Sequence, residues 1–341
     1  MHMADALLSP AVGGTLWVAA AGTIAYCSKQ VRDKLDERQV PLMGVLGAFL
    51  FAAQMINFSI PGTGSSGHLG GGMLLAILLG PHAAFLTIAS VLVVQALFFA
   101  DGGLLALGCN LFNLGFFPAF VAYPLLYRTI AGERPSQTRL TVATIVAAIV
   151  GLQLGAFGVV AETVASGISS LPFATFVYFM QPVHLAIGVV EGFVTAAIVV
   201  FVHRARPEML RAAPARGSGR PLRRVLLTFL AAAALTGGVL SWFASKDPDG
   251  LEWSIAQVTG RETLPGPEEG FHARLAAFQE RVAMLPDYAF SKTPAAAGEE
   301  AGDTEEGRLG SSVSGLVGGA ITLLLALLIG FLLKWRVRAA R

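Results

Sequence analysis

The sequence predicts an all-α fold, that of a polytopic helical membrane protein with about nine transmembrane helices. Composition is the first indication, because 54% of the 341 residues are hydrophobic and only 13% are charged, against about 25% charged in an ordinary soluble domain. The second is a set of long apolar runs that contain no Lys or Arg, most of them near the ~20 residues needed to cross a bilayer. The runs cover residues 11–27, 41–57, 69–100, 103–127, 140–162, 182–202, 225–243 and 313–333.

Basic residues predict the orientation of these runs, because Lys and Arg mark short cytoplasmic loops. They cluster at residues 29–38, 128–139, 204–224 and 334–341. If these segments are cytoplasmic, the first helix runs inward, and both Met1 and the loop at 58–68 lie outside. We therefore expect the N-terminus outside and the C-terminus in the cytoplasm.

The third run, 69–100, must contain two helices if the loops are to alternate between the two sides. Gly80-Pro81 marks the break, because Pro is well tolerated at the first position of a helix. The split gives helices over about 69–80 and 81–100 and brings the predicted number of spans to nine. At ~1.5 Å per residue the first of these reaches only ~18 Å, so we expect protein rather than lipid around it.

A basic stretch rich in Pro and Gly separates two expected modules. We predict a seven-span module at 1–205, a cytoplasmic linker at 206–222 and a two-span accessory module at 223–341. The accessory module contains an extracytoplasmic domain at 246–311 with 13 acidic and 6 basic residues, a local charge of −7. Such a segment attracts cations only weakly and generally, and we expect a mostly solvated loop with some helix near 270–284.

The N-terminus combines a free amine with a histidine at position 2, a pattern that favours chelation. The Met1 amine, the His2 amide nitrogen and a His2 imidazole nitrogen are three nearly coplanar donors, which suit square-planar Ni(II) or Cu(II). His68 lies in a glycine-rich loop expected on the same side, so it can supply a fourth nitrogen. No secretory signal precedes the first span, so we expect the mature chain to begin at Met1.

The other ionisable groups are expected to have structural roles. His184 and Glu191 share a face of the seventh span, but about 10 Å separates them along the helix axis at ~1.5 Å per residue. We therefore expect them to support the fold or the site. His272 is expected on the solvated surface of the external domain. Cys27 and Cys109 belong to different spans, and neither a disulfide nor a metal role is expected.

Three segments occur in the order MHMADALLSP, VLGAFLFAAQMINFSIPGTGSSGHLGGG and ILLGPHAAFLT. In sequence and order they resemble the CbiM/NikM family, the substrate-binding (S) component of nickel/cobalt energy-coupling factor (ECF) ABC transporters. The segment PDGLEWS at 248–254, with its flanking spans, is similar to the small NikN/CbiN-like accessory subunit of the same systems. The resemblance therefore covers two subunits fused in one chain.

This resemblance implies that Met1, His2 and His68 bind the metal and that Ni2+ or Co2+ is the transported substrate, with no organic cofactor. It implies a transmembrane coupling (T) protein and a pair of cytoplasmic ATPases as partners, in the lipid of a prokaryotic cytoplasmic (inner) membrane, and no nucleic acid. Ala48 and Ala52 resemble the small-residue surface that such components offer to the coupling protein. The chain itself has no ATPase loop, because none of its lysines follows a glycine.

The sequence therefore favours capture of Ni2+, in preference to Co2+, for ATP-driven import, and it does not favour an enzyme. Two alternatives stay open. An intramembrane zinc-dependent enzyme would use His68, His184 and Glu191 with a bound water, although no HExxH pair occurs. A channel or secondary metal permease would also be helical, although the inverted repeats typical of many permeases are not visible in the sequence. Of these three interpretations, only metal capture for import requires a free Met1 amine.

Overall fold

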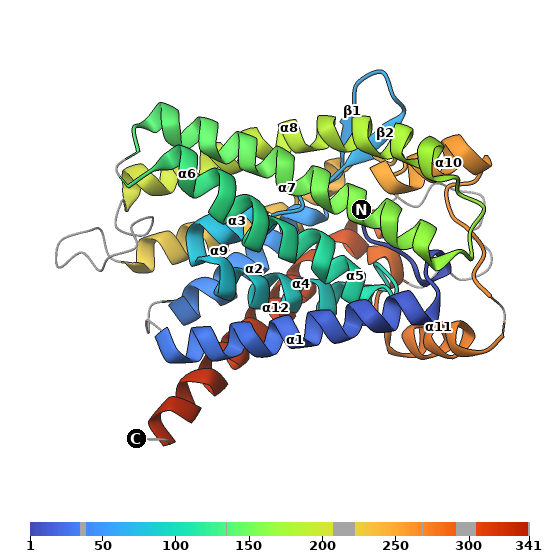
Figure 1. Ribbon diagram of the computed structural model, residues 1–341. Helices are drawn as coiled ribbons and strands as arrows, with labels where there is room; N and C mark the ends of the chain where they lie inside the picture. Colours follow the sequence, from blue (N-terminus) through green and yellow to red (C-terminus); the bar gives the residue numbers. More distant parts are fainter. Residues whose placement is uncertain (35–38, 134, 207–221, 268, 291–304, 340–341) are drawn as a thin grey trace.

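The chain folds as a bundle of long helices, with a two-stranded hairpin and several short helices gathered at one end (Figure 1). A computed structural model describes residues 1–34, 39–133, 135–206, 222–267, 269–290 and 305–339. The longer helices are α1 Pro10–Lys34, α2 Gln39–Gln54, α4 Pro81–Phe99, η2 Phe112–Tyr127, α7 Gln137–Ser166, α8 Phe173–Ala205, α9 Leu222–Gly238 and α12 Glu305–Ala339, where η marks a 3-10 or π helix. The shorter elements are η1 Asp5–Leu7, β1 Phe58–Ile60, β2 Ser65–Gly67, α3 Gly72–Leu79, α5 Leu107–Leu111, α6 Arg128–Ala131, η4 Leu240–Phe243, α10 Gly250–Thr259, α11 Phe271–Val282 and η5 Pro286–Tyr288.

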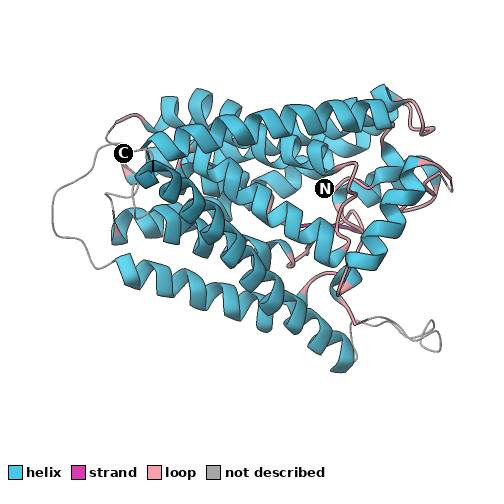
Figure 2. Cartoon of the chain, turned by 90° about the horizontal axis from the view of Figure 1, so that it is seen from below, coloured by secondary structure: helices cyan, strands magenta, loops and turns pink. Residues whose placement is uncertain are grey.

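The predicted fold class is confirmed, because the described residues are predominantly helical with very little strand (Figure 2). They include six helices long and apolar enough to cross a membrane. These are α1, α4, the continuous α5–η2–α6 helix, α7, α8 and α12. The helices α2 and α9 are shorter, at 16 and 17 residues. The predicted number of nine spans therefore stays a prediction.

The break predicted in the third apolar run lies where the Gly-Pro pair indicated. Helix α3 ends at Leu79 and α4 begins at Pro81. Gly80, between them, has a φ of 77°, a left-handed conformation that favours glycine. All eight residues of α3 are buried, as expected for a helix too short to span a bilayer by itself.

Two helices from the C-terminal part of the chain, α9 and α12, pack against α2. Ala48 and Ala52, on α2, are only 3% and 1% exposed. They pack with Ala233 of α9 and Leu323 of α12. A coupling protein therefore reaches these two alanines only if α9 and α12 move aside.

The N-terminal segment and the short helices of residues 245–290 lie together at one end of the bundle, away from the C-terminus (Figure 1). Helix α11 confirms the helix predicted near 270–284. His272, at its start, was expected on the solvated surface, and that expectation is wrong: its side chain is buried, and its Nε2 donates to the carbonyl of Leu8 at 2.8 Å. The reason is that α11 packs on the N-terminal segment instead of standing free in solvent. Cys27 and Cys109 are both free and buried, as expected.

Candidate metal site

The N-terminal segment enters the bundle as an extended chain held by Asn110. The backbone N–H of Met3 donates to Oδ1 of Asn110 at 2.8 Å, and the amide nitrogen of Asn110 donates back to the Met3 carbonyl at 3.2 Å. The N–H of Gly103 donates to the same carbonyl at 2.9 Å. These three bonds fix the backbone of a fully buried residue and so determine where Met1 and His2 lie.

His68 follows the β1–β2 hairpin and precedes α3. The loop after it is held by Glu191 of α8, whose carboxylate accepts hydrogen bonds from the N–H groups of Gly70 at 2.9 Å and Gly71 at 2.8 Å. Gly71 has a φ of 74°, so a residue with a side chain would be strained there. Glu191 thus has the supporting role expected from the sequence: it positions the histidine loop through its backbone.

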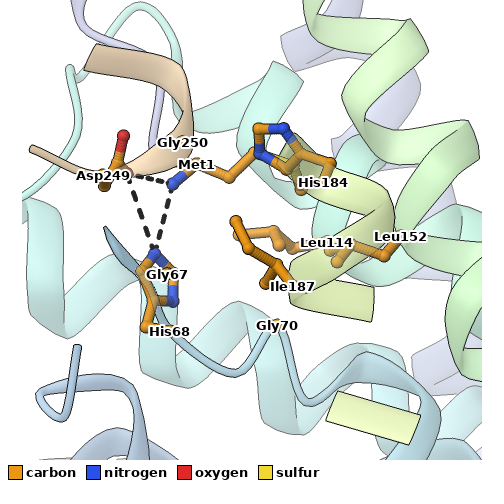
Figure 3. Close-up of a pocket in the computed structure, with 10 residues that line it drawn as sticks. All are labelled: Met1, Gly67, His68, Gly70, Leu114, Leu152, His184, Ile187, Asp249 and Gly250. Atoms are coloured by element: carbon orange, nitrogen blue, oxygen red, sulfur yellow. Dashed lines mark hydrogen bonds and ion pairs between the residues drawn. The ribbon is translucent and has the colours of Figure 1, made fainter. Parts of the chain in front are cut away.

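The three residues predicted to bind metal meet at one point. The Met1 amine lies 3.2 Å from Nε2 of His68, and the rings of His2 and His68 stack with their centroids 5.0 Å apart. Figure 3 shows Met1 and His68 pointing toward one another, with Asp249 beside them. The backbone carbonyl of Leu69 accepts from Nδ1 of His68 at 3.1 Å. Nε2 therefore carries the lone pair, the form in which histidine binds metal.

Two carboxylates that the sequence did not single out complete the site. Oδ2 of Asp249 forms an ion pair with the Met1 ammonium. Asp101 accepts from Nδ1 of His2 at 2.9 Å and from the hydroxyl of Tyr288 at 2.5 Å. The only local sequence signal for either carboxylate is the capping box of α10, in which Asp249 also accepts from the N–H groups of Leu251 and Glu252.

Burial and these pairings set the protonation of the site. Burial, followed by the charges of the Met1 ammonium and His2, lowers the pKa of His68 to about 3. Burial by itself would raise the pKa of Asp249, but the Met1 ammonium outweighs it and holds that pKa below its ordinary value. For Asp101, burial likewise raises the pKa, but the interaction with His2 outweighs it and keeps the pKa below its ordinary value. The site therefore presents a neutral imidazole beside two carboxylates.

The arrangement can chelate a cation once the N-terminal nitrogens exchange partners. The Met1 amine and the His2 amide nitrogen close a five-membered ring around a metal ion, and Nδ1 of His2 closes a six-membered ring. Nε2 of the same ring points away from the backbone and cannot close it. In the structure the Met1 amine and Nδ1 of His2 are the atoms paired with Asp249 and Asp101. A planar set of four nitrogens, the fourth from His68, would require those pairs to open and the Met1 ammonium, the His2 amide and Nδ1 of His2 each to lose a proton.

The loop before α10 covers the site by binding the β1–β2 hairpin. Ser66 donates from its backbone N–H to the Pro248 carbonyl at 2.8 Å and from its hydroxyl to the Asp247 carbonyl at 2.7 Å. The indole of Trp253 donates to the Thr63 carbonyl at 3.0 Å. Asp249 is thereby held above Met1 through contacts on both sides of it.

The residues of the alternative zinc site do not form a metal-binding cluster. Within the part of the chain that the structure describes, no group of three His, Cys, Asp or Glu side chains is arranged to hold a metal ion. Both oxygens of Glu191 accept backbone hydrogen bonds. His184 lines the same small cavity as Met1 and His68.

Comparison with known protein families divides the chain into two matches. Residues 2–209 match the CbiM family model, described as the cobalt uptake substrate-specific transmembrane region. Residues 223–335 match the PDGLE domain model.

Several relatives contain both parts in one chain. A putative fused nickel transport protein, NikMN, from Archaeoglobus fulgidus is 31% identical over the full length of both chains. The fused nickel transport protein NikMN of Rhodobacter capsulatus is 32% identical over 85% of this chain and 88% of its own. A relative that is not named as a fusion, the cobalt transport protein CbiM of Geobacter sulfurreducens, is 30% identical over 70% of this chain and 71% of its own.

A solved structure shares the fold of the larger part. The crystal structure of a truncated transition metal transporter superimposes with a TM-score of 0.53 at 29% sequence identity. It covers 60% of this chain and 99% of that one.

Proposed function

This chain belongs to the CbiM family and carries a PDGLE domain fused behind it, and from that premise we propose that it captures a divalent transition metal for ATP-driven import. The ion would bind at the outer face through the Met1 amine, the amide and imidazole nitrogens of His2, and His68. The chain would act as the substrate-binding component of an energy-coupling factor transporter.

One observation carries this proposal: residues 1, 2 and 68, far apart in the sequence, bring nitrogen donors together in a buried position. The 3.2 Å between the Met1 amine and Nε2 of His68 is a distance that a shared cation can replace with two metal–nitrogen bonds. The imidazole ring of His2 stacks on the ring of His68 and therefore lies at the same position. Nitrogen ligands suit Ni(II), Co(II) and Cu(II) rather than Mg(II) or Ca(II).

Nickel is the preferred substrate in this proposal. A planar set of four nitrogens suits Ni(II) better than Co(II). Relatives that share both parts of the chain over most of its length are named as nickel transport proteins. Cu(II) binds nitrogen ligands more tightly than either ion, so affinity alone does not determine what is carried.

The proposal also includes the source of energy for import and the orientation of the chain in the membrane. We propose a transmembrane coupling protein and a cytoplasmic ATPase pair as partners, because the sequence contains no ATPase loop. The N-terminus and the domain at 246–311 would face outward and the C-terminus the cytoplasm, as the basic residues predict. The enzyme alternative lacks support, since relatives are named as transport proteins.

Titration of the purified full-length protein with Ni(II) and Co(II) tests the site. His2→Ala, His68→Ala and a variant with one residue added before Met1 should each lose more than the ~10–100-fold of affinity that removing a supporting group costs. His272→Ala is the matched control, because it removes a buried histidine that is not among the proposed ligands and that donates to the Leu8 carbonyl.

Equal binding by the native and extended proteins would overturn the N-terminal chelate. Binding of neither metal by the native protein would overturn the proposed function itself. In that case the channel and permease alternatives would become the better explanation of the fold.

A further inference from the structure

Helix α11 is tied to the ends of two helices that are long and apolar enough to cross a membrane. Nε2 of His272, near its start, donates at 2.8 Å to the carbonyl of Leu8, two residues before α1 begins. The side-chain amide of Gln279 donates to the carbonyls of Ala96 at 2.9 Å and Gly102 at 2.7 Å, on either side of the end of α4. Figure 1 shows α11 at the edge of the bundle, beside the start of α1. The helix is therefore held where these spans meet the surface of the bilayer.

The side chains of α11 follow one another around the helix in a definite order. The side that bonds to α1 and α4 comes first, and at about 100° per residue Phe271 and Phe278 lie next to it. These phenylalanines are 51% and 52% exposed. Two exposed arginines, Arg274 and Arg281, come next, and exposed Glu280 lies beyond them. The helix therefore presents an aromatic stripe, Phe271 and Phe278, beside a basic stripe, Arg274 and Arg281.

This order is typical of a helix that lies in a membrane interface. Such a helix places its apolar side chains about 5–10 Å into the boundary between headgroups and acyl chains. Arginine side chains next to them reach back to the headgroups, because the aliphatic part of the side chain tolerates an apolar surrounding. Met284, which follows α11 and is 63% exposed, adds another apolar side chain at its end.

Exposed aromatic side chains also occur elsewhere at the Met1 end of the bundle. They are Phe173 and Tyr178 in the first two turns of α8, and Trp242 and Phe243 in η4, which leads into residues 245–290. Aromatic residues are enriched where spans meet the interface between membrane and water. The aromatic stripe of α11 therefore belongs to the end of the bundle at which other side chains already mark the bilayer surface.

We propose that α11 lies in this interface, with its aromatic stripe among the acyl chains and its basic stripe against lipid phosphates. The leaflet is the one at the Met1 end of the bundle, which is the outer leaflet in the proposed orientation. Charge favours this placement: the segment 246–311 has a local charge of −7, yet two of its six basic residues form one stripe on α11. The inference does not depend on the identity of the metal or on the ligands that bind it.

Spin labelling of the full-length protein in lipid vesicles tests the inference. A nitroxide on Phe278→Cys reports on the aromatic stripe, and a nitroxide on Glu280→Cys, on the opposite side of the same helix, is the matched control. The native Cys27 and Cys109 are free but fully buried, so the label reaches the introduced thiol. Oxygen concentrates among acyl chains, whereas chromium oxalate stays in water. We expect the ratio of oxygen to chromium oxalate accessibility to be severalfold higher at position 278 than at position 280.

Two results would overturn the inference. High chromium oxalate accessibility at both positions would show that α11 stands in water. Low accessibility of both reagents at position 278 would show that protein, and not lipid, covers the aromatic stripe. Phe271→Cys repeats the measurement on the same stripe if Phe278→Cys fails to fold.

Vesicles that contain phosphatidylglycerol test the basic stripe separately. The double variant Arg274→Gln, Arg281→Gln should lower oxygen accessibility at position 278 toward the value at position 280, because the helix loses its contact with the phosphates. Oxygen is uncharged, so the change in local charge does not itself alter its access. Arg261→Gln, which removes an exposed arginine outside α11, should leave the value unchanged. Equal oxygen accessibility in the double variant and the parent would overturn the phosphate contact.

Discussion

The two halves of the candidate site are held in place in different ways. His68 is positioned through the backbone of the loop after it, which Glu191 fixes, and its Nε2 faces the site. Met1 and His2 follow the backbone anchored at Met3, and the Met1 amine and Nδ1 of His2 are each paired with a carboxylate. The loop half is ready to bind a cation, whereas the N-terminal half must first exchange partners.

The difference shows where the affinity of such a site can be set. A preorganised ligand group loses little conformational entropy when the metal binds, because folding has already fixed its conformation. When a ligand atom already has an ionic partner, the free energy of metal binding is the difference between the new metal bond and the ion pair that is lost. If the proposed site is right, the carboxylates stabilise the metal-free protein and moderate its affinity for the ion.

Replacing Glu191 with alanine breaks the preorganised half and should have the largest effect. The N–H groups of Gly70 and Gly71 would lose their acceptor, and each buried unsatisfied group costs about 1–3 kcal/mol. Thermal unfolding in detergent should shift to lower temperature, and calorimetric titration should show Ni(II) affinity lower by ~10–100-fold. Glu191→Gln, which keeps an acceptor oxygen, should lose less. Native-like affinity in Glu191→Ala would mean that the loop is held by other contacts.

Acidification should have the next largest effect, and it acts through His68. The pKa of this imidazole is lowered from its ordinary 6.5 to about 3 by burial, so below pH ~6.5 the unfolded chain binds a proton that the folded chain does not. The stability of the metal-free protein should be complete above that pH and should fall steadily toward pH 3. The low pKa values of Asp101 and Asp249 add a loss only below their ordinary 3.8.

Thermal unfolding between about pH 7 and pH 4 measures this effect. His68→Gln should flatten the curve in that range, because glutamine does not titrate. A curve that keeps the native slope would show that other groups carry the pH dependence.

Replacing Asp249 with asparagine changes the N-terminal half and should have the smallest effect, with the opposite sign. Asparagine still caps α10, but it no longer stabilises the Met1 ammonium that a metal must displace. We expect Ni(II) to bind about tenfold more tightly, equivalent to ~1.4 kcal/mol, and the metal-free protein to be less stable. Asp247→Asn is the control, because Asp247 is exposed and its carboxylate accepts from Ser59 and Ser245. Weaker binding in Asp249→Asn would indicate that this carboxylate stays beside the ion as a counter-charge.

Sequence patterns predicted those features that have a local cause. Gly80-Pro81 predicted the end of α3, because glycine and proline restrict the backbone around them. The helical pattern near 270–284 predicted α11. The basic loops predicted only that His2 and His68 lie on the same side of the membrane, and the family resemblance implied that both bind the metal.

The remaining features depend on contacts between distant parts of the chain. Asp249 pairs with an amine 248 positions away, and the bond between Asp101 and Tyr288 spans 187 positions. No local pattern signals either contact. His272 lies on a helix that is polar enough to predict exposure, but the N-terminal segment covers it. The separation of His184 from Glu191 along α8 was foreseen, whereas its orientation toward the cavity depends on how α10 docks.

The shortness of α3 has a consequence for the synthesis of the protein. Eight residues cover only ~12 Å of a ~30 Å hydrocarbon layer, so the nascent helix has no stable position in lipid before its neighbours have been made. The carboxylate that fixes the loop leading into α3 lies about 120 positions further on. At roughly 5–20 residues per second, the ribosome needs several seconds to reach it. The loop that carries His68 therefore cannot reach its final position until α8 has been made.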